Sequence, residues 1–299
     1  MSRLRALVLG AAAGGGLPQW NCACHNCNLA REGKIPAQTQ SSLAVSCDGV
    51  SWAVLNASPD IRSQLTVNSQ MWPQELRGSP VKCVILTNGD IDHIGGLLTL
   101  REKQRLRLFF TDDMSEILSV NPVFAALDPA LVQRVACALG AWFDVLPGLS
   151  ARLFAVPGKV PLYLETGTTE TTLIGGQTVG AEMKSGGARL VYIPGCSKMT
   201  EEIRAVIDGS DALFFDGTLF RDDEMILEGL GSKTGQRMGH MPISGASGSL
   251  EMLAGVNAGR KVYVHMNNTN PVWRPDSQER RTVQSAGVEL GFDGMELVL

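Results

Sequence analysis

Two carboxylates and an imidazole lie close together in residues 87–96, which read TNGDIDHIGG. Asp90, Asp92 and His93 follow the apolar run 81–86, which is typical of a short buried strand, and they precede the expected start of a helix. Carboxylate oxygen and imidazole nitrogen together are ligands for a divalent ion such as zinc, manganese or iron(II). The alternative interpretation is an ordinary helix N-terminus, with an aspartate as its cap and the histidine in solvent.

A second candidate metal site is the C-x-C-x-x-C cluster of Cys22, Cys24 and Cys27. Three thiolates at this spacing can converge on one ion, and zinc is the usual ion for such soft ligands. Three ligands do not complete a tetrahedron, so a fourth is expected from elsewhere, because His25 lies between two of the cysteines and is expected to point away. The alternative is three ordinary thiols in a loop. The odd total of seven cysteines favours a reducing compartment and a metal over a disulfide framework.

Apolar runs and their periodicity predict the elements that would position these side chains. The expected strands are 4–9, 41–46, 52–56, 81–86, 106–110, 151–164, 171–179, 189–193, 212–215 and 261–264. Helices are expected at 59–65, from residue 97 onward, at 111–139 with breaks at two prolines, at 201–207 and at 249–256. No linker or repeat divides the chain, so a single domain over 1–299 is the simplest expectation.

Polar side chains directly follow several of the predicted strands. They are Asp90, Asp92, His93, Cys196, Asp216 and His265. In layered α/β proteins the loops at strand ends converge, and ligand sites collect there. A single histidine after a strand is more often structural, but two histidines and three carboxylates at such positions together predict a metal site.

Composition limits the classes of function. The 299 residues are 44% apolar and 19% charged, as in an ordinary globular protein, and the net charge of −4 with no basic run gives no reason to expect nucleic acid. The apolar stretch 6–13 is short for a signal peptide and runs into glycines, so we expect a first strand and a turn there. No apolar run is long enough for a membrane helix. A cytoplasmic location is therefore expected.

Residues 87–96 resemble the signature of the metallo-β-lactamase superfamily, T-H-x-H-x-D-H-x-G-G. Asn88 and Asp90 occupy its first two histidine positions, whereas Asp92 and His93 match it. Further along the chain, His265 resembles the last metal histidine of the superfamily, and Cys196 stands where its members usually have a bridging aspartate.

The resemblance is more specific in three further stretches. The opening 10–22, the segment 56–62 and the run 265–271 are similar to the B-protein family of pyrroloquinoline quinone (PQQ) biosynthesis, as is the order of the strands. This likeness implies an α/β (α+β layered) fold, the metallo-β-lactamase-like four-layer αββα sandwich. Relatives with a C-x-C-x-x-C cluster complete their structural zinc with a histidine from a late Gly-His motif, which implies His240 here.

The departures from the signature bear on the reaction. The ligands that remain, Asp92, His93 and His265, form the two-histidine, one-carboxylate triad of oxygen-activating iron(II), with Asp90 as a fourth ligand or an orienting group. The family view then implies an iron(II)- and O2-dependent oxygenase that hydroxylates the tyrosine ring of a Glu–Tyr-derived precursor of PQQ. The alternatives are a carrier for PQQ or its precursor, serving transport toward the periplasm, and a residual metal-dependent hydrolase.

Such a precursor carries several carboxylates, which need cationic partners. Arg62 and Lys198 lie near predicted strand ends, and Asn267, Asn268 and Thr269 follow His265, so we expect these five residues to bind substrate. The alternative is that the two cations are solvated surface charges. The expected partner is this small-molecule or dipeptide-derived precursor, with neither nucleic acid nor membrane, and a homodimer is one candidate assembly.

Overall fold

Two mixed β-sheets form the centre of the computed structural model, which describes residues 3–167 and 169–299. The first has the order β14-β1-β2-β3-β4-β5-β6 and the second β13-β12-β11-β10-β9-β8-β7. The first sheet contains β1 (Arg5–Gly10), β2 (Ser42–Ser46), β3 (Trp52–Leu55), β4 (Val81–Ile85), β5 (Leu106–Phe110), β6 (Val132–Ala136) and β14 (Glu296–Val298). The second contains β7 (Trp142–Leu146), β8 (Leu149–Ala155), β9 (Val179–Ser185), β10 (Ala188–Ile193), β11 (Ala212–Asp216), β12 (Arg260–Val264) and β13 (Val288–Leu290).

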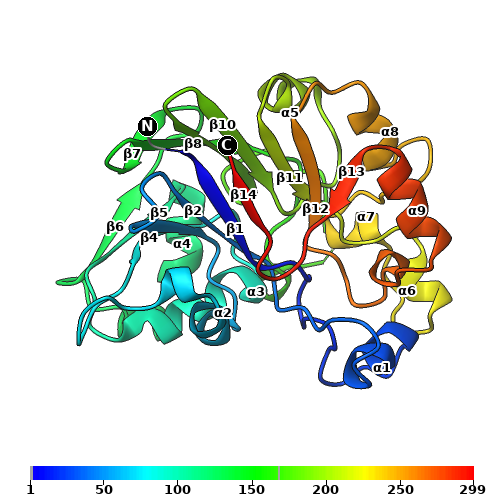
Figure 1. Ribbon diagram of the computed structural model, residues 1–299, viewed down its shortest axis with the longest axis horizontal. Coiled ribbons are helices and arrows are strands. Elements are labelled where there is room, and N and C mark those ends of the chain that lie inside the picture. The colour runs from blue at the N-terminus through cyan, green and yellow to red at the C-terminus, as the bar shows by residue number, and fades with distance from the viewer. Residues whose placement is uncertain (1–2, 168) are drawn as a thin grey trace.

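Helices cover the outer faces of both sheets, as Figure 1 shows. The α-helices are α1 (His25–Arg31), α2 (Ile61–Val67), α3 (Ile91–Ile94), α4 (Asp112–Ser119), α5 (Glu201–Ile207), α6 (Glu224–Leu227), α7 (Gly235–Met238), α8 (Ser249–Ala254) and α9 (Gln278–Ser285). The 3-10 turns are η1 (Ser69–Met71), η2 (Gly95–Arg101), η3 (Pro122–Ala126), η4 (Leu162–Leu164) and η5 (Pro271–Trp273). The expected four-layer αββα sandwich is therefore confirmed.

Alternation along the strands decides what each sheet buries. In β1, Ala6 and Val8 belong to the core between the sheets, whereas Leu7 and Leu9 belong to the core under α2 and α4. Because both faces of the strand are covered, its sequence is almost continuously apolar. Because such strands are buried on two faces, short apolar runs in the sequence were enough to predict them.

The prediction for residues 111–139 is partly wrong. The expected helix is present as α4 and η3, but the chain then forms β6, which pairs in parallel with β5. Pro129 ends the helical pattern, and in β6 buried Val132 is followed by exposed Gln133 and Arg134. An edge strand of this kind has little apolar signal of its own, so its pairing with β5 decides its conformation.

The predictions for 151–164 and 171–179 are also partly wrong. The first strand ends at Ala155, and 162–164 form the turn η4. In the second range only isolated bridges precede β9, at Leu173 and Thr178. The Gly158–Leu173 bridge places this irregular segment beside the end of β8.

Parallel pairing brings the chemically active loops to one edge. Strands β3 and β4 pair in parallel, as do β10, β11 and β12, so their C-terminal ends lie together. Within the described part of the chain, no helix is both long and apolar enough to span a bilayer.

Candidate metal centres

The loop after β4 is held from both sides. The side chain of Asn56, at the end of β3, donates to Thr87 Oγ1 at 2.8 Å and accepts from Thr87 N at 2.9 Å. Ala57 N donates to His93 O at 2.8 Å, which fixes the short helix α3 against the same loop. Gly96 permits this approach, because a Cβ there would lie 2.1 Å from Ser58 O. The position of the Asp–His loop is thus set by the neighbouring strand.

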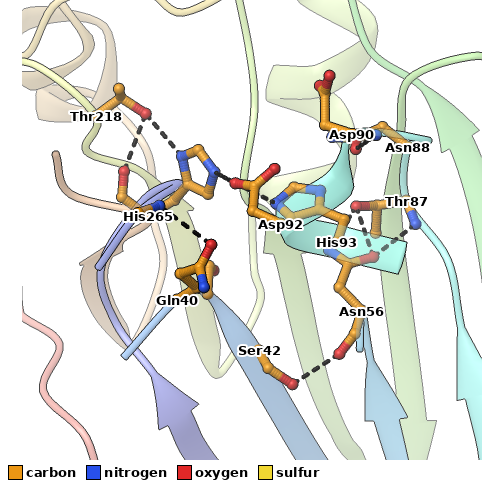
Figure 2. Close-up of polar contacts among 12 residues, drawn as sticks. Gln40, Ser42, Asn56, Thr87, Asn88, Asp90, Asp92, His93, Thr218 and His265 are labelled. Atoms are coloured by element: carbon orange, nitrogen blue, oxygen red, sulfur yellow. Dashed lines mark hydrogen bonds and ion pairs between the residues drawn. The ribbon is translucent and has the colours of Figure 1, made fainter. Parts of the chain in front are cut away.

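Asp92, His93 and His265 converge although His265 directly follows β12 of the other sheet (Figure 2). One ligand atom from each lies within 4.8 Å of the others. Asp92 Oδ2 is 3.2 Å from His265 Nε2 and 3.9 Å from His93 Nε2. Neither ring nitrogen of His93 has a hydrogen-bond partner among the described residues, although the side chain is buried. A buried imidazole with no partner is a costly arrangement, and a divalent ion would satisfy it, so these residues fit a metal.

Burial and charge act in opposite directions at this centre. Burial lowers the pKa of His93 to about 4, which keeps its imidazole neutral and able to bind an ion. Burial would raise the pKa of Asp92, but the neighbouring His93 and His265 outweigh it and hold that pKa below its usual range. Burial would likewise lower the pKa of His265, but its hydrogen bond to Asp92 and the nearby aspartates raise it. Because a ligand binds an ion in its deprotonated form, an ion here would have to displace any proton held on His265 Nε2.

The backbone of His265 is in the left-handed region, with φ of 57°. Such a conformation costs a residue with a Cβ on the order of 1 kcal/mol and requires support from its surroundings. Met266 supplies that support, because its N donates to Ala11 O and its O accepts from Ala13 N. The strain is therefore localised at a candidate metal ligand.

The Thr218 hydroxyl orients the ring of His265. It donates to Asp216 Oδ1 at 2.6 Å and lies 2.8 Å from His265 Nδ1. With its own hydrogen directed to Asp216, the hydroxyl accepts from Nδ1–H. This tautomer leaves Nε2, the nitrogen that faces Asp92, for the ion.

His240 lies in this centre and not at the Cys cluster, contrary to the prediction. Its Nδ1 is 2.7 Å from Asp216 Oδ2, and its ring stacks on His265 with centroids 5.1 Å apart. Asp216, His240 and His265 form a second group whose ligand atoms lie within 4.8 Å of one another. The physical reason is the end of α7: Gly239 adopts φ of 91°, and Met241 N donates to Cys196 O. That turn fixes His240 against the strand ends.

Asn88 and Asp90, at the positions of the two missing signature histidines, make other contacts. Asn88 Oδ1 accepts from Asp90 N at 3.0 Å, and Asp90 Oδ1 accepts from Leu162 N at 3.3 Å. Burial and the nearby Asp92 raise the pKa of Asp90. The buried thiol of Cys196 donates to Lys198 O at 3.3 Å.

A carboxylate is nevertheless present where sequence comparison placed only a cysteine. Asp216 Oδ2 accepts from Cys196 N at 2.9 Å and from His240, while Oδ1 accepts from Thr218 N at 3.0 Å and from its hydroxyl. Because both oxygens are already engaged, Asp216 acts here as an orienting group.

The Cys cluster is compact and lies beyond the ends of the sheets, at α1 (Figure 1). The three sulfurs lie within 4.8 Å of one another, and all three residues are free thiols. Asn268, which we expected to bind substrate, instead places its carboxamide against these sulfurs and is 3% exposed. The donor set fits a soft ion such as zinc.

The other expected substrate residues are not gathered at the triad. Arg62 and Lys198 are exposed, and neither forms an ion pair with a described residue. Asn267 donates to Thr269 Oγ1 at 2.6 Å, and Thr269 donates to Glu224 on α6. These contacts engage both polar side chains within the loop.

Two contributors escaped the sequence analysis. A Cβ on Gly14 would lie 3.3 Å from Asp92 Oδ2, so this glycine keeps space beside the triad. Thr218 directly follows the Asp-Gly pair at the end of β11, and its proximity to a strand end is the only sequence signal that could have indicated it.

Comparisons with known proteins agree with this architecture. Residues 51–266 match the family model of the beta-lactamase superfamily domain. Coenzyme PQQ synthesis protein B of Rhizobium meliloti (strain 1021) is 58% identical over 300 residues, covering 100% of this chain and 99% of the relative. The protein of the same name from Ruegeria pomeroyi is 53% identical over 99% of this chain and 100% of the relative.

Solved structures extend the comparison. Zinc-bound PqqB of Methylobacterium extorquens superposes with a TM-score of 0.97 at 50% identity, covering 99% of this chain and 100% of that one. A diphosphatase of the PhnP family, with a TM-score of 0.69 at 18% identity over 99% of this chain and 97% of its own, shares the fold alone. With such identity over its whole length, the chain belongs to the coenzyme PQQ synthesis protein B family, within the metallo-β-lactamase superfamily.

Proposed function

We propose that this protein acts in PQQ biosynthesis as an iron(II)-dependent oxygenase that hydroxylates the tyrosine ring of a Glu–Tyr-derived precursor. The observation that carries the proposal is the convergence of Asp92, His93 and His265, with a buried His93 whose ring nitrogens have no hydrogen-bond partner among the residues described. Two imidazoles and one carboxylate are the donor set of oxygen-activating nonheme iron.

The surroundings of the triad favour one ion over the two that hydrolases of this fold use. A second ion would need ligands at Asn88, Asp90 and Cys196. Asn88 offers an amide already engaged with Asp90 N, and the Cys196 thiol is directed to a backbone carbonyl. Both carboxylate oxygens of Asp216 already accept hydrogen bonds from other residues of the protein. The signature positions for a second ion therefore lack available ligands, which favours a mononuclear centre, and the group of Asp216, His240 and His265 shares its histidine with the triad.

The side chains have separable tasks in the proposed reaction. Asp92, His93 and His265 would hold the ion, and Thr218 fixes the tautomer of His265. Bound iron(II) would supply activation of O2, with one oxygen atom entering the ring, the other leaving as water, and two electrons coming from an external reductant. Asp216 anchors Nδ1 of His240 and so holds this ring beside the centre.

The test is a single-turnover reaction of anaerobically purified protein loaded with iron(II). With a Glu–Tyr dipeptide, ascorbate and ¹⁸O2, we expect a ring-hydroxylated product carrying one labelled oxygen, detected by mass spectrometry. Zinc-loaded protein is the matched control and should form none.

Each alternative outcome has its own signature. Dipeptide cleavage without O2 would support a hydrolase, and tight binding of PQQ or the dipeptide without turnover would support a carrier. The Arg62→Ala variant checks substrate capture: because Arg62 is exposed and unpaired among the described residues, we expect an unchanged KM at moderate salt.

A further inference from the structure

Two cations, Lys159 and Arg237 on α7, share one carboxylate and are called the cation pair below. Lys159 Nζ lies 3.1 Å from Glu165 Oε1, and Arg237 Nη2 donates to Glu165 Oε2 at 2.9 Å. The hydrogen bonds from Arg237 and Lys159 lower the pKa of Glu165 to about 2, so this carboxylate is ionised at neutral pH. In the described part of the chain no other carboxylate forms an ion pair with either cation. The group therefore carries one uncompensated positive charge.

Lys159 lies beside the Asp–His centre. A Cβ on Gly239, directly before His240, would lie 3.3 Å from Lys159 Cγ, so the stem of the lysine passes against the turn that fixes His240. Burial and Asp92 raise the pKa of Asp90, and the ammonium group of Lys159 opposes them. The lysine is therefore close to both Asp90 and His240, which come from different sheets.

The backbone around Lys159 is fixed independently of its charge. The Thr178 hydroxyl donates to Lys159 O at 3.1 Å. Three residues further on, Leu162 N donates to Asp90 Oδ1 at 3.3 Å, which joins this stretch to the signature loop. The lysine is thus positioned by main-chain contacts, and its ion pair with Glu165 is not needed to bring it to the centre.

The ammonium group of Lys159 has a donor to spare. The side chain is only 11% exposed, so most of the cost of removing this charge from water is already included in the folded state. Of the three N–H donors, one is directed to Val160 O at 3.2 Å and one faces Glu165. The third has no acceptor among the described residues. An anionic ligand would therefore gain a charge-assisted hydrogen bond with little further desolvation of the protein.

Carboxylates gather at the centre and would by themselves repel an anionic precursor. They belong to Asp90, Asp92 and Asp216. A bound divalent ion would offset their charge, but the carboxylates of the precursor need cationic partners of their own. The cation pair, only partly neutralised by its shared carboxylate, supplies such a partner beside the triad.

We propose that Lys159, supported by Arg237, binds a carboxylate of the precursor, and that Glu165 occupies the two cations before substrate enters. The substrate carboxylate would then share the cation pair with Glu165. Lys159 takes the role that the sequence assigned to Arg62 and Lys198, and it sets the preference of the site for anionic precursors. The anionic precursor is that of the proposed function, on which this proposal rests.

The first test measures binding to the unaltered, zinc-loaded protein, which requires no turnover. Titration calorimetry compares a Glu–Tyr dipeptide with Gln–Tyr amide, in which neutral amides replace both carboxylates. We expect the dipeptide to bind at least about tenfold more tightly than the amide. Equal affinities, or no binding of the dipeptide, would overturn the proposal. Absence of hydroxylation by the iron-loaded protein would instead overturn the proposed reaction and leave this result in place.

Two variants distinguish substrate binding from a merely structural ion pair. Lys159→Met keeps the length of the side chain but removes its charge, so the dipeptide should bind about tenfold more weakly and the amide as before. Glu165→Gln removes the competing carboxylate and should strengthen dipeptide binding several-fold. Both variants break the same Lys159–Glu165 contact, so a structural role alone would change affinity in the same direction in both, and that result would overturn the proposal. Lys198→Met is the matched control and should bind both ligands normally, because Lys198 is exposed.

Discussion

The Cys cluster and the Asp–His centre arrange their candidate ligands in opposite ways. Cys22, Cys24 and Cys27 come from one short segment, and the carboxamide of Asn268 covers them. Asp92 and His93 meet His265 at the end of the other sheet, and within the described chain neither ring nitrogen of His93 has a hydrogen-bond partner. The first arrangement is closed and suits a structural ion, whereas the second keeps ligand positions for chemistry.

The two sites nevertheless share one loop. His265 directly follows β12, and Asn268 lies in the next turn, in which Asn270 N donates to Asn267 O at 3.0 Å. Asn270 also donates its side chain to Gly217 O at 2.9 Å, which fixes the loop to the end of β11. The closed site can therefore stabilise the strained backbone of His265, on which the open site depends, although the two sites have separate ligands.

The largest expected effect comes from His265→Ala. This change removes a ligand of the triad, so the iron content should fall to background and the hydroxylated product should disappear. The zinc of the Cys site has other ligands and should remain at one per chain. Metal analysis and single-turnover product yield measure both. Retention of iron and product by the variant would exclude the triad and favour the carrier interpretation.

Cys24→Ser should separate the sites in the other direction. Losing a thiolate should release zinc from the cluster and lower the melting temperature, because a closed zinc site contributes on the order of 10 kcal/mol in small zinc peptides, a contribution shared here with a large core. Cys137→Ser is the matched control, since that buried cysteine lies outside the cluster and should keep the zinc. Unchanged zinc content in Cys24→Ser would reject the site.

A smaller effect is expected from Thr218→Val, which keeps the shape but removes the hydroxyl that orients His265. Outer partners of metal ligands usually contribute about 10–100-fold to affinity, so iron should bind that much more weakly while the Cys-site zinc is unaffected. Thr218→Ser retains the hydroxyl and should restore affinity. If both variants bind iron equally, the hydroxyl does not set the tautomer.

Local spacing made much of this molecule predictable. The cysteine cluster and the loop from Asp90 to His93 are visible because their members are close in sequence, and His265 was found because it directly follows a strand. The fold was predictable for a related reason: its strands are short apolar runs, and the resemblance supplied their layering.

Long-range convergence accounts for the rest. Whether His240 faces Asp216 or the cysteines depends on the turn at Gly239, which no spacing encodes. Asn268 was assigned to substrate because an amide is an ordinary hydrogen-bonding group, and only its position over three sulfurs indicates another role. The edge strand β6 was missed because its pairing with β5 outweighs a weak local pattern.

The smallest expected effect tests how the shared loop is held. Glu224 is buried and accepts from Phe220 N at 2.8 Å and from the Thr269 hydroxyl; burial raises its pKa to about 7. Between pH 4.5 and about 7 the folded state therefore keeps a proton that the unfolded chain releases. The stability that this proton adds is complete below the unfolded pKa of 4.5 and is lost as pH rises through about 7. That loss is at most about 1.4 kcal/mol per pH unit. Glu224→Gln should flatten the dependence of unfolding free energy on pH between about 5 and 7, measured by urea denaturation of zinc-loaded protein, with the exposed Glu251→Gln as control. Iron affinity should not change, because Glu224 touches the loop at Thr269 and not at a ligand. An unaltered slope in Glu224→Gln would mean that the carboxylate is ionised in the folded protein and that Thr269 stabilises its charged form.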